Sequence, residues 1–120
     1  MAWSEYDYQQ YLQRQGTSCT RDELENSFQS RVVRLAKDHS WLVYHTRDSR
    51  GSAEGFPDLV LVREVIIFAE LKTRTGKLTA EQDRWLTMLA APGLVSVYLW
   101  RPSDWPAIEQ RLTRPWRSIP

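Results

Sequence analysis

The chain has 120 residues, which is enough for one domain of ordinary size and too few for two. Apolar residues make up 42% of it, which excludes wholesale disorder, and the single cysteine excludes an internal disulfide and a cysteine-rich zinc site. The 16 Lys and Arg residues nearly balance the 15 Asp and Glu residues, so net charge gives no sign of a polyanionic partner. Because the sequence contains no apolar run of membrane-spanning length and no signal-like start, we expect a cytoplasmic protein that does not bind a membrane.

The first half of the chain predicts an arm, a helix and three strands. Residues 1–19 hold aromatic side chains and glutamines without a sustained period, so we expect an N-terminal arm there. A capping box at Thr20 and Glu23, followed by apolar residues at helical spacing, predicts a helix over 21–38. Runs of β-branched and aromatic residues predict strands over 41–46, 59–62 and 65–71.

The second half predicts two more helices and one more strand. A second capping box, Thr79 with Gln82, begins a helix that a Pro-Gly pair ends. A strand over 94–100 and a last helix follow, and residues 113–120 form a tail. The order α-β-β-β-α-β-α predicts an α/β domain over 20–112, in which helices flank a small mixed sheet.

The residues that point to chemistry are Asp58, Glu70 and Lys72. Glu70 and Lys72 lie two apart on a predicted strand, so both side chains point to one face, which is otherwise apolar. Taken alone, they can equally form an ordinary charge pair. Asp58 shares this face if residues 63–65 form a three-residue hairpin loop, or if a bulge intervenes, because Asp58 then pairs with Glu70. A two-residue turn would send Asp58 to the opposite face.

Two carboxylates on adjacent strands, with a backbone carbonyl between Glu70 and Lys72, form a set of hard oxygen ligands. Mg²⁺ and Mn²⁺ prefer such ligands and keep several waters, whereas zinc would want His or Cys. A bound metal lowers the pKa of its water and neutralises charge on a phosphate, and a nearby Lys supports developing charge. These groups therefore suit phosphodiester hydrolysis.

Pro57-Asp58 followed by Glu70-Leu71-Lys72 resembles the signature of the PD-(D/E)XK nucleases, whose fold has a restriction-endonuclease-like core. More narrowly, the chain from about Glu25 to Asp104 resembles a small VRR-NUC (virus-type replication-repair nuclease) domain. The motifs that carry this closer resemblance are an acidic residue in the first helix, Tyr44-His45, Gly55-Phe56-Pro57-Asp58-Leu59-Val60, Glu70-Leu71-Lys72, Gly76-Lys77-Leu78-Thr79 with Gln82 and Trp85, and Arg101-Pro102 with Asp104.

The resemblance implies a role for Asp58 and for the three consecutive residues 70–72. Asp58 and Glu70 bind Mg²⁺ or Mn²⁺, and Leu71 contributes its backbone carbonyl. Lys72 positions the attacking water. These positions form the core of the implied catalytic site.

Two helix residues complete the implied site. Glu25 assists a metal or its water, with Asp22 and Glu23 as neighbouring alternatives. Gln82 orients Lys72 or contacts phosphate, although its place in a capping box also accounts for it fully.

Basic residues flank the expected site and are the candidates for contacts to DNA: His45, Arg47, Arg50, Arg74 and Lys77. His45 can alternatively be a structural residue at a strand end. Arg31, Arg34 and Lys37 are instead expected to form a solvated helix face.

The function that the resemblance implies is a metal-dependent DNA endonuclease. The chain resembles a small stand-alone VRR-NUC protein of phage or bacterial type. Such proteins resemble Holliday junction resolvases, so branched DNA is the expected substrate and a homodimer the expected assembly. The candidates for the interface are the large apolar or aromatic groups near the two termini: Trp105, Trp116, Ile119, Trp3, Tyr6, Tyr8 and Tyr11. Alternatively, these side chains fold back on their own sheet and leave a monomer. The alternatives are a less selective nickase or restriction-like nuclease, and a DNA-binding module of the same fold without turnover.

Overall fold

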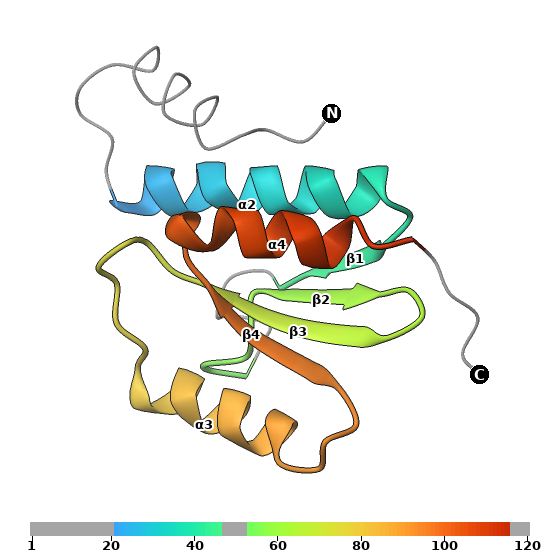
Figure 1. Ribbon diagram of the computed structural model, residues 1–120. Helices are drawn as coiled ribbons and strands as arrows, with labels where there is room; N and C mark the ends of the chain where they lie inside the picture. The colour runs from blue at the N-terminus through green and yellow to red at the C-terminus, as the bar shows by residue number, and fades with distance from the viewer. Residues whose placement is uncertain (1–20, 47–52, 116–120) are drawn as a thin grey trace.

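The computed structural model describes residues 21–46 and 53–115 (Figure 1). The predicted arm over 1–19 and most of the predicted tail lie outside these residues. The helices and strands are α2 (Arg21–Asp38), β1 (Leu42–His45), β2 (Leu59–Val62), β3 (Ile66–Leu71), α3 (Ala80–Ala90), β4 (Ser96–Trp100) and α4 (Trp105–Leu112), with a 3₁₀ turn over Pro102–Asp104. This order is the predicted one. β2 has the predicted bounds, and the other strands differ from prediction by one or two residues at one or both ends.

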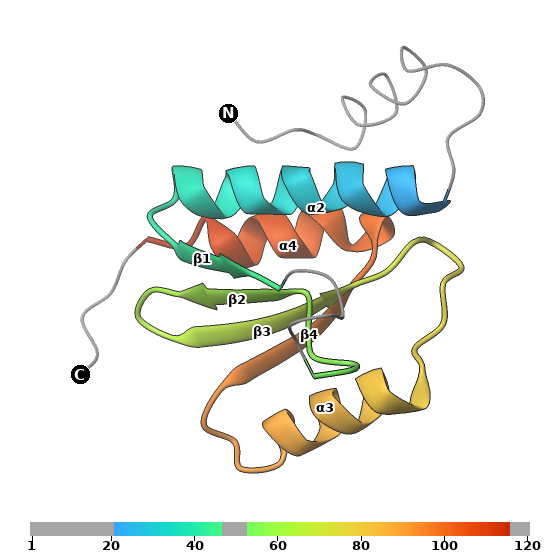
Figure 2. The ribbon, with the colours of Figure 1, turned by 180° about the vertical axis from the view of Figure 1, so that it is seen from behind.

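The strands form one mixed sheet in the order β1-β2-β3-β4. β2 is antiparallel to β1 and to β3, whereas β4 is parallel to β3 and is reached through α3. α2 and α4 lie side by side over one face of the sheet, and α3 lies on the other (Figures 1 and 2). The predicted α/β class is confirmed, and the arrangement is consistent with a restriction-endonuclease-like core.

The main core lies between the sheet and the pair α2 and α4. It takes every second residue of the central strands, because alternate side chains of a strand point to opposite faces. The strand residues buried in it are Leu59, Leu61, Ile67, Ala69, Leu71 and Trp100. The other face therefore carries the intervening residues, including Val60, Phe68 and Glu70.

The packing of α4 on α2 corrects two predictions. Trp105, expected at an interface, is 2% exposed and belongs to the core. Arg31, expected on a solvated helix face, is 4% exposed, and its guanidinium lies 3.9 Å from the centre of the Trp105 ring. Both predictions were wrong because α4 folds back over α2, so the two side chains bury each other. Arg34 and Lys37 are exposed, as expected.

Within residues 21–46 and 53–115, no helix combines the length and the apolar character that a membrane span requires.

Candidate active site

The hairpin of β2 and β3 has the register on which the site depends. Val62 pairs with Ile66, and Val60 pairs with Phe68. The loop therefore has three residues, 63–65, and the Arg63 N–H donates a 3.0 Å hydrogen bond to the Val65 carbonyl across it. The predicted register is confirmed. Continued by one more pair on this face, it sets Asp58 opposite Glu70.

Asp58 lies just before β2 and is held from two sides. Its carboxylate oxygen Oδ2 accepts a 2.8 Å hydrogen bond from the Leu71 N–H at the end of β3. Its carbonyl accepts a 2.9 Å bond from the Thr46 N–H, and the Thr46 hydroxyl donates a 2.7 Å bond to the Pro57 carbonyl. Asp58 is thereby fixed between the ends of β1 and β3. Sequence reasoning missed Thr46, because this contact depends on which strands become neighbours.

The backbone at the end of β3 alternates its hydrogen bonds between the two neighbouring strands. The Lys72 N–H donates a 3.0 Å bond to the Trp100 carbonyl on the β4 side. The Leu71 N–H points the other way, to Asp58. Since the N–H and C=O of one strand residue point to the same side, the Leu71 carbonyl is directed to the side of Asp58.

Glu70 and Lys72 differ in their exposure. Glu70 is 2% exposed, although carboxylates are almost never fully buried without compensating charge or hydrogen bonds. Lys72 is half-buried just beyond the strand. The structure therefore brings Asp58, Glu70 and Lys72 to one end of the sheet, at the carboxyl end of β3.

The loop after Lys72 is held by Arg101. The Arg101 guanidinium donates 2.7 and 2.6 Å hydrogen bonds to the carbonyls of Thr73 and Gly76, and the Thr73 hydroxyl accepts a 3.0 Å bond from the Gly76 N–H. Arg74 and Lys77 are exposed on this loop. The loop thus presents two of the predicted DNA-contacting residues to solvent beside Lys72.

Gln82 forms the predicted capping box at the start of α3. Its side-chain oxygen accepts a 2.9 Å bond from the Thr79 N–H, and its own N–H donates a 3.1 Å bond to the Thr79 hydroxyl. The structural account of Gln82 is confirmed. The amide NH₂ is the group left for a contact to substrate.

The segment that leads to Asp58 is docked on α3. Gly55 has φ +85°, and a Cβ there would lie 2.6 Å from the backbone carbon of Glu81. The Trp85 indole N–H donates a 3.1 Å bond to the Glu54 carbonyl, and the Phe56 ring packs edge-on against Trp85 with centres 5.0 Å apart. A glycine before an aromatic residue is the one sequence signal of this close approach.

The structure describes the side chain of only one of the remaining predicted site residues, which are Glu25, His45, Arg47 and Arg50. Glu25 lies in α2, which begins at the same end of the molecule as the carboxyl end of β3 (Figures 1 and 2), but its side chain is outside the described part. The exposed His45 ring is hydrogen-bonded to the Gln29 side chain of α2. Because His45 pairs with Leu59, it lies on the sheet face opposite to Glu70. Arg47 and Arg50 lie outside the described residues.

The oxygen atoms of the site suit a hard divalent metal ion. Among the described side chains, no group of three or more His, Cys, Asp or Glu gathers as a metal site. Asp58 and Glu70 supply two carboxylates and Leu71 a carbonyl directed to the same side. Since Mg²⁺ keeps several waters and needs only one or two carboxylates from the protein, these oxygens fit it.

Comparison with known proteins gives one match. The family model of the VRR-NUC domain matches residues 1–99, which include Asp58, Glu70 and Lys72. No curated protein and no solved structure matches the chain.

We predict that Gly55→Ala destabilises the protein more than Gly93→Ala. Both glycines have positive φ, and an alanine there costs about 1–2 kcal/mol. A Cβ at Gly93 meets no atom within 4 Å, whereas one at Gly55 collides with α3, which adds about 1–3 kcal/mol of overpacking. Urea denaturation measures the two free energies of unfolding. Equal losses would show that the 54–58 segment does not dock on α3 as described.

We also predict that Asp58→Ala and Asp58→Asn separate the structural role of this side chain from its charge. Asp58→Ala leaves the Leu71 N–H without its acceptor and should cost about 1–3 kcal/mol of unfolding free energy. Asp58→Asn keeps an acceptor oxygen and should retain most of the stability. Thermal or urea denaturation of both variants provides the test. An equal loss in the two variants would contradict the hydrogen bond as the stabilising contact.

Proposed function

The chain belongs to the VRR-NUC domain family, and from this we propose that it is a divalent-metal-dependent DNA endonuclease built on Asp58, Glu70 and Lys72. Membership of the family implies a nuclease of the PD-(D/E)XK type, with DNA as substrate. The metal requirement and the residues of the site are the proposed part.

One observation carries the proposal. The Asp58 carboxylate accepts the Leu71 N–H at 2.8 Å, one residue after the buried Glu70 and one before Lys72. Two segments that lie more than ten residues apart in sequence thus bring both carboxylates and the lysine to the same end of the sheet. This arrangement supports the proposed site.

Each residue of the proposed site has a separate task. Asp58 and Glu70 hold Mg²⁺ or Mn²⁺ together with the Leu71 carbonyl, and Glu25 assists from α2. When bound, such a metal neutralises charge on the scissile phosphate and lowers the pKa of its water. The Lys72 ammonium orients the attacking water and offsets the negative charge that grows on the phosphate oxygens as the P–O bond breaks. Gln82 steadies this lysine or the phosphate through its amide NH₂.

The proposed DNA contacts are not equally supported. Arg74 and Lys77 are exposed on the loop beside Lys72, so they are the best supported. Arg47 and Arg50 are proposed from sequence alone. His45 is the least supported, because its ring bonds to Gln29 on the other face of the sheet.

The preferred DNA and the assembly are finer proposals that rest on the family resemblance. We propose branched DNA of the Holliday junction type as the substrate and a symmetric homodimer as the active assembly. We propose the cytoplasm as the location of the protein. Because Trp105 is buried within the protomer, an interface must be made by other residues. A nickase, a restriction-like nuclease and an inert DNA-binding module are the alternatives.

We predict that Glu70→Gln lowers cleavage at least about 100-fold, which corresponds to about 2.7 kcal/mol of transition-state stabilisation. Asp58→Asn should lose cleavage comparably, and Lys72→Ala should cut slowly while still binding metal. The assay uses linear, nicked, flap and four-way DNAs with Mg²⁺ or Mn²⁺.

Glu64→Gln is the matched control, because this glutamate pairs with Arg63 at the far end of the hairpin and should leave cleavage unchanged. Cleavage by Glu70→Gln at the wild-type rate would refute the site. Binding of DNA by the unmodified protein without any cleavage would favour the inert module.

A further inference from the structure

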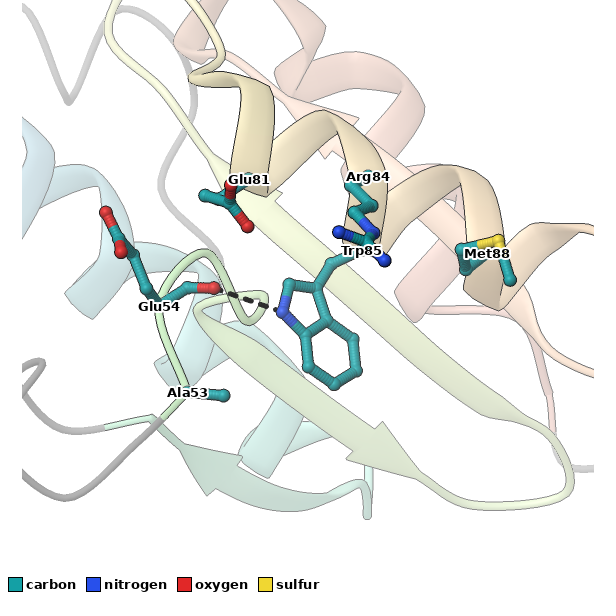
Figure 3. A pocket seen from close by; sticks show the side chains of 6 residues that line it. All are labelled: Ala53, Glu54, Glu81, Arg84, Trp85 and Met88. Carbon is teal, nitrogen blue, oxygen red and sulfur yellow. Dashed lines mark hydrogen bonds between the residues drawn. The ribbon is translucent and has the colours of Figure 1, made fainter.

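A cavity lies between α3 and the start of the segment that leads to Asp58, and residues outside the proposed chemistry line it. Its volume is about 420 Å³, within the range of ligand-binding pockets. It opens between the start of the 53–58 segment and the side of α3 that carries Trp85 and Met88 (Figure 3). The lining residues are Ala53, Glu54, Glu81, Arg84, Trp85 and Met88.

Trp85 gives the cavity a fixed aromatic wall. Its indole N–H is bonded to the Glu54 carbonyl, and the Phe56 ring packs against it, so the ring is held in one orientation. Met88, one turn further along α3, is 65% exposed and extends this apolar surface (Figure 3). A fixed aromatic ring beside a flexible thioether is well suited to a planar apolar group, because little ordering is needed when the group binds.

The polar side chains around the cavity are of mixed sign. Glu54 and Glu81 are exposed carboxylates from the loop and from α3, and Arg84 is an exposed guanidinium. Two carboxylates repel a phosphate, so the DNA backbone is a poor occupant. The edge of a nucleobase fits better, because carboxylates accept hydrogen bonds from base amino groups and arginine donates to base oxygen and nitrogen.

The cavity lies within reach of the DNA that the proposed site would cut. Glu54 and Asp58 are four residues apart, and chain geometry limits their separation to about 14 Å. One DNA strand covers this distance in about four nucleotides at 3.4 Å per nucleotide. A base in the cavity would therefore belong to the strand segment next to the scissile phosphate.

We propose that this cavity receives an unpaired nucleobase of the DNA substrate, stacked on Trp85. The inference rests on the proposed endonuclease function and deepens it, because a base within a duplex would have to leave its stack to enter. Substrates that already hold an unpaired nucleotide avoid this cost. The cavity thus supplies a physical basis for selection of branched or interrupted DNA.

Affinity for three matched DNAs tests the proposal: a duplex with one bulged cytosine, the same duplex with an abasic bulge, and a flush duplex. Fluorescence anisotropy with the unmodified protein in EDTA measures the dissociation constants without cleavage. We expect the bulged cytosine to bind about tenfold more tightly than the abasic bulge, as base stacking on an aromatic side chain requires. Equal affinity for the two bulges would overturn the proposal.

Met88→Asp and Leu94→Asp are a matched pair of variants. Both replace an exposed apolar residue, 65% and 85% exposed, so both should fold, but only Met88 lines the cavity. Met88→Asp should abolish the preference for the cytosine bulge and leave affinity for the abasic bulge like that of Leu94→Asp. Leu94→Asp should keep the preference. A preference that survives Met88→Asp would overturn the proposal.

The same proteins separate this inference from the proposed function. Cleavage of DNA with Mg²⁺, without a preference for the bulged base, would retain the endonuclease and remove the base-binding cavity. A base preference that Met88→Asp abolishes, in a protein that cuts none of the DNAs, would retain the cavity and refute the endonuclease.

Discussion

The hydrogen bond from the Leu71 N–H to the Asp58 carboxylate joins the parts of the molecule on which the proposed site depends. Asp58 directly precedes β2, and Leu71 is the last residue of β3. The Asp58 side chain therefore accepts the hydrogen bond that a backbone carbonyl of β2 would accept if the strand pairing continued. This bond fixes Asp58 against the strand that carries Glu70. It also uses one lone pair of Oδ2, so Oδ1 is the carboxylate oxygen that we propose for a metal, and Asp58 has a structural and a proposed chemical task.

Much of this arrangement could be predicted from sequence, because it depends on local patterns. The capping box of Thr79 and Gln82 and the helix over 21–38 follow from neighbours within one or two turns. The alternation of Phe68 and Glu70 with buried residues follows from strand geometry. The register of β2 and β3 was predicted only because the site requires it. The loop sequence itself does not indicate it, since Arg63, Glu64 and Val65 include no glycine that would mark the turn.

Contacts between distant segments could not be predicted in the same way. Trp105 and Arg31 bury each other because α4 lies over α2, and nothing near either residue in sequence indicates this. Thr46 holds the Pro57-Asp58 segment only because β1 is the neighbour of β2. Trp85 is half-buried and forms the wall of a cavity, because α3 meets the 54–56 segment, which is distant from it in sequence.

The proposed catalysis requires Asp58 and Glu70 to share one divalent metal at the end of β3. Crystals grown with Mn²⁺ and measured for anomalous scattering test it directly, because the map locates the metal without reference to activity. We expect one peak in contact with Asp58 Oδ1, the Glu70 carboxylate and the Leu71 carbonyl, and we expect its loss in Asp58→Asn crystals. A peak elsewhere on the chain, or one that persists unchanged in Asp58→Asn crystals, would contradict it.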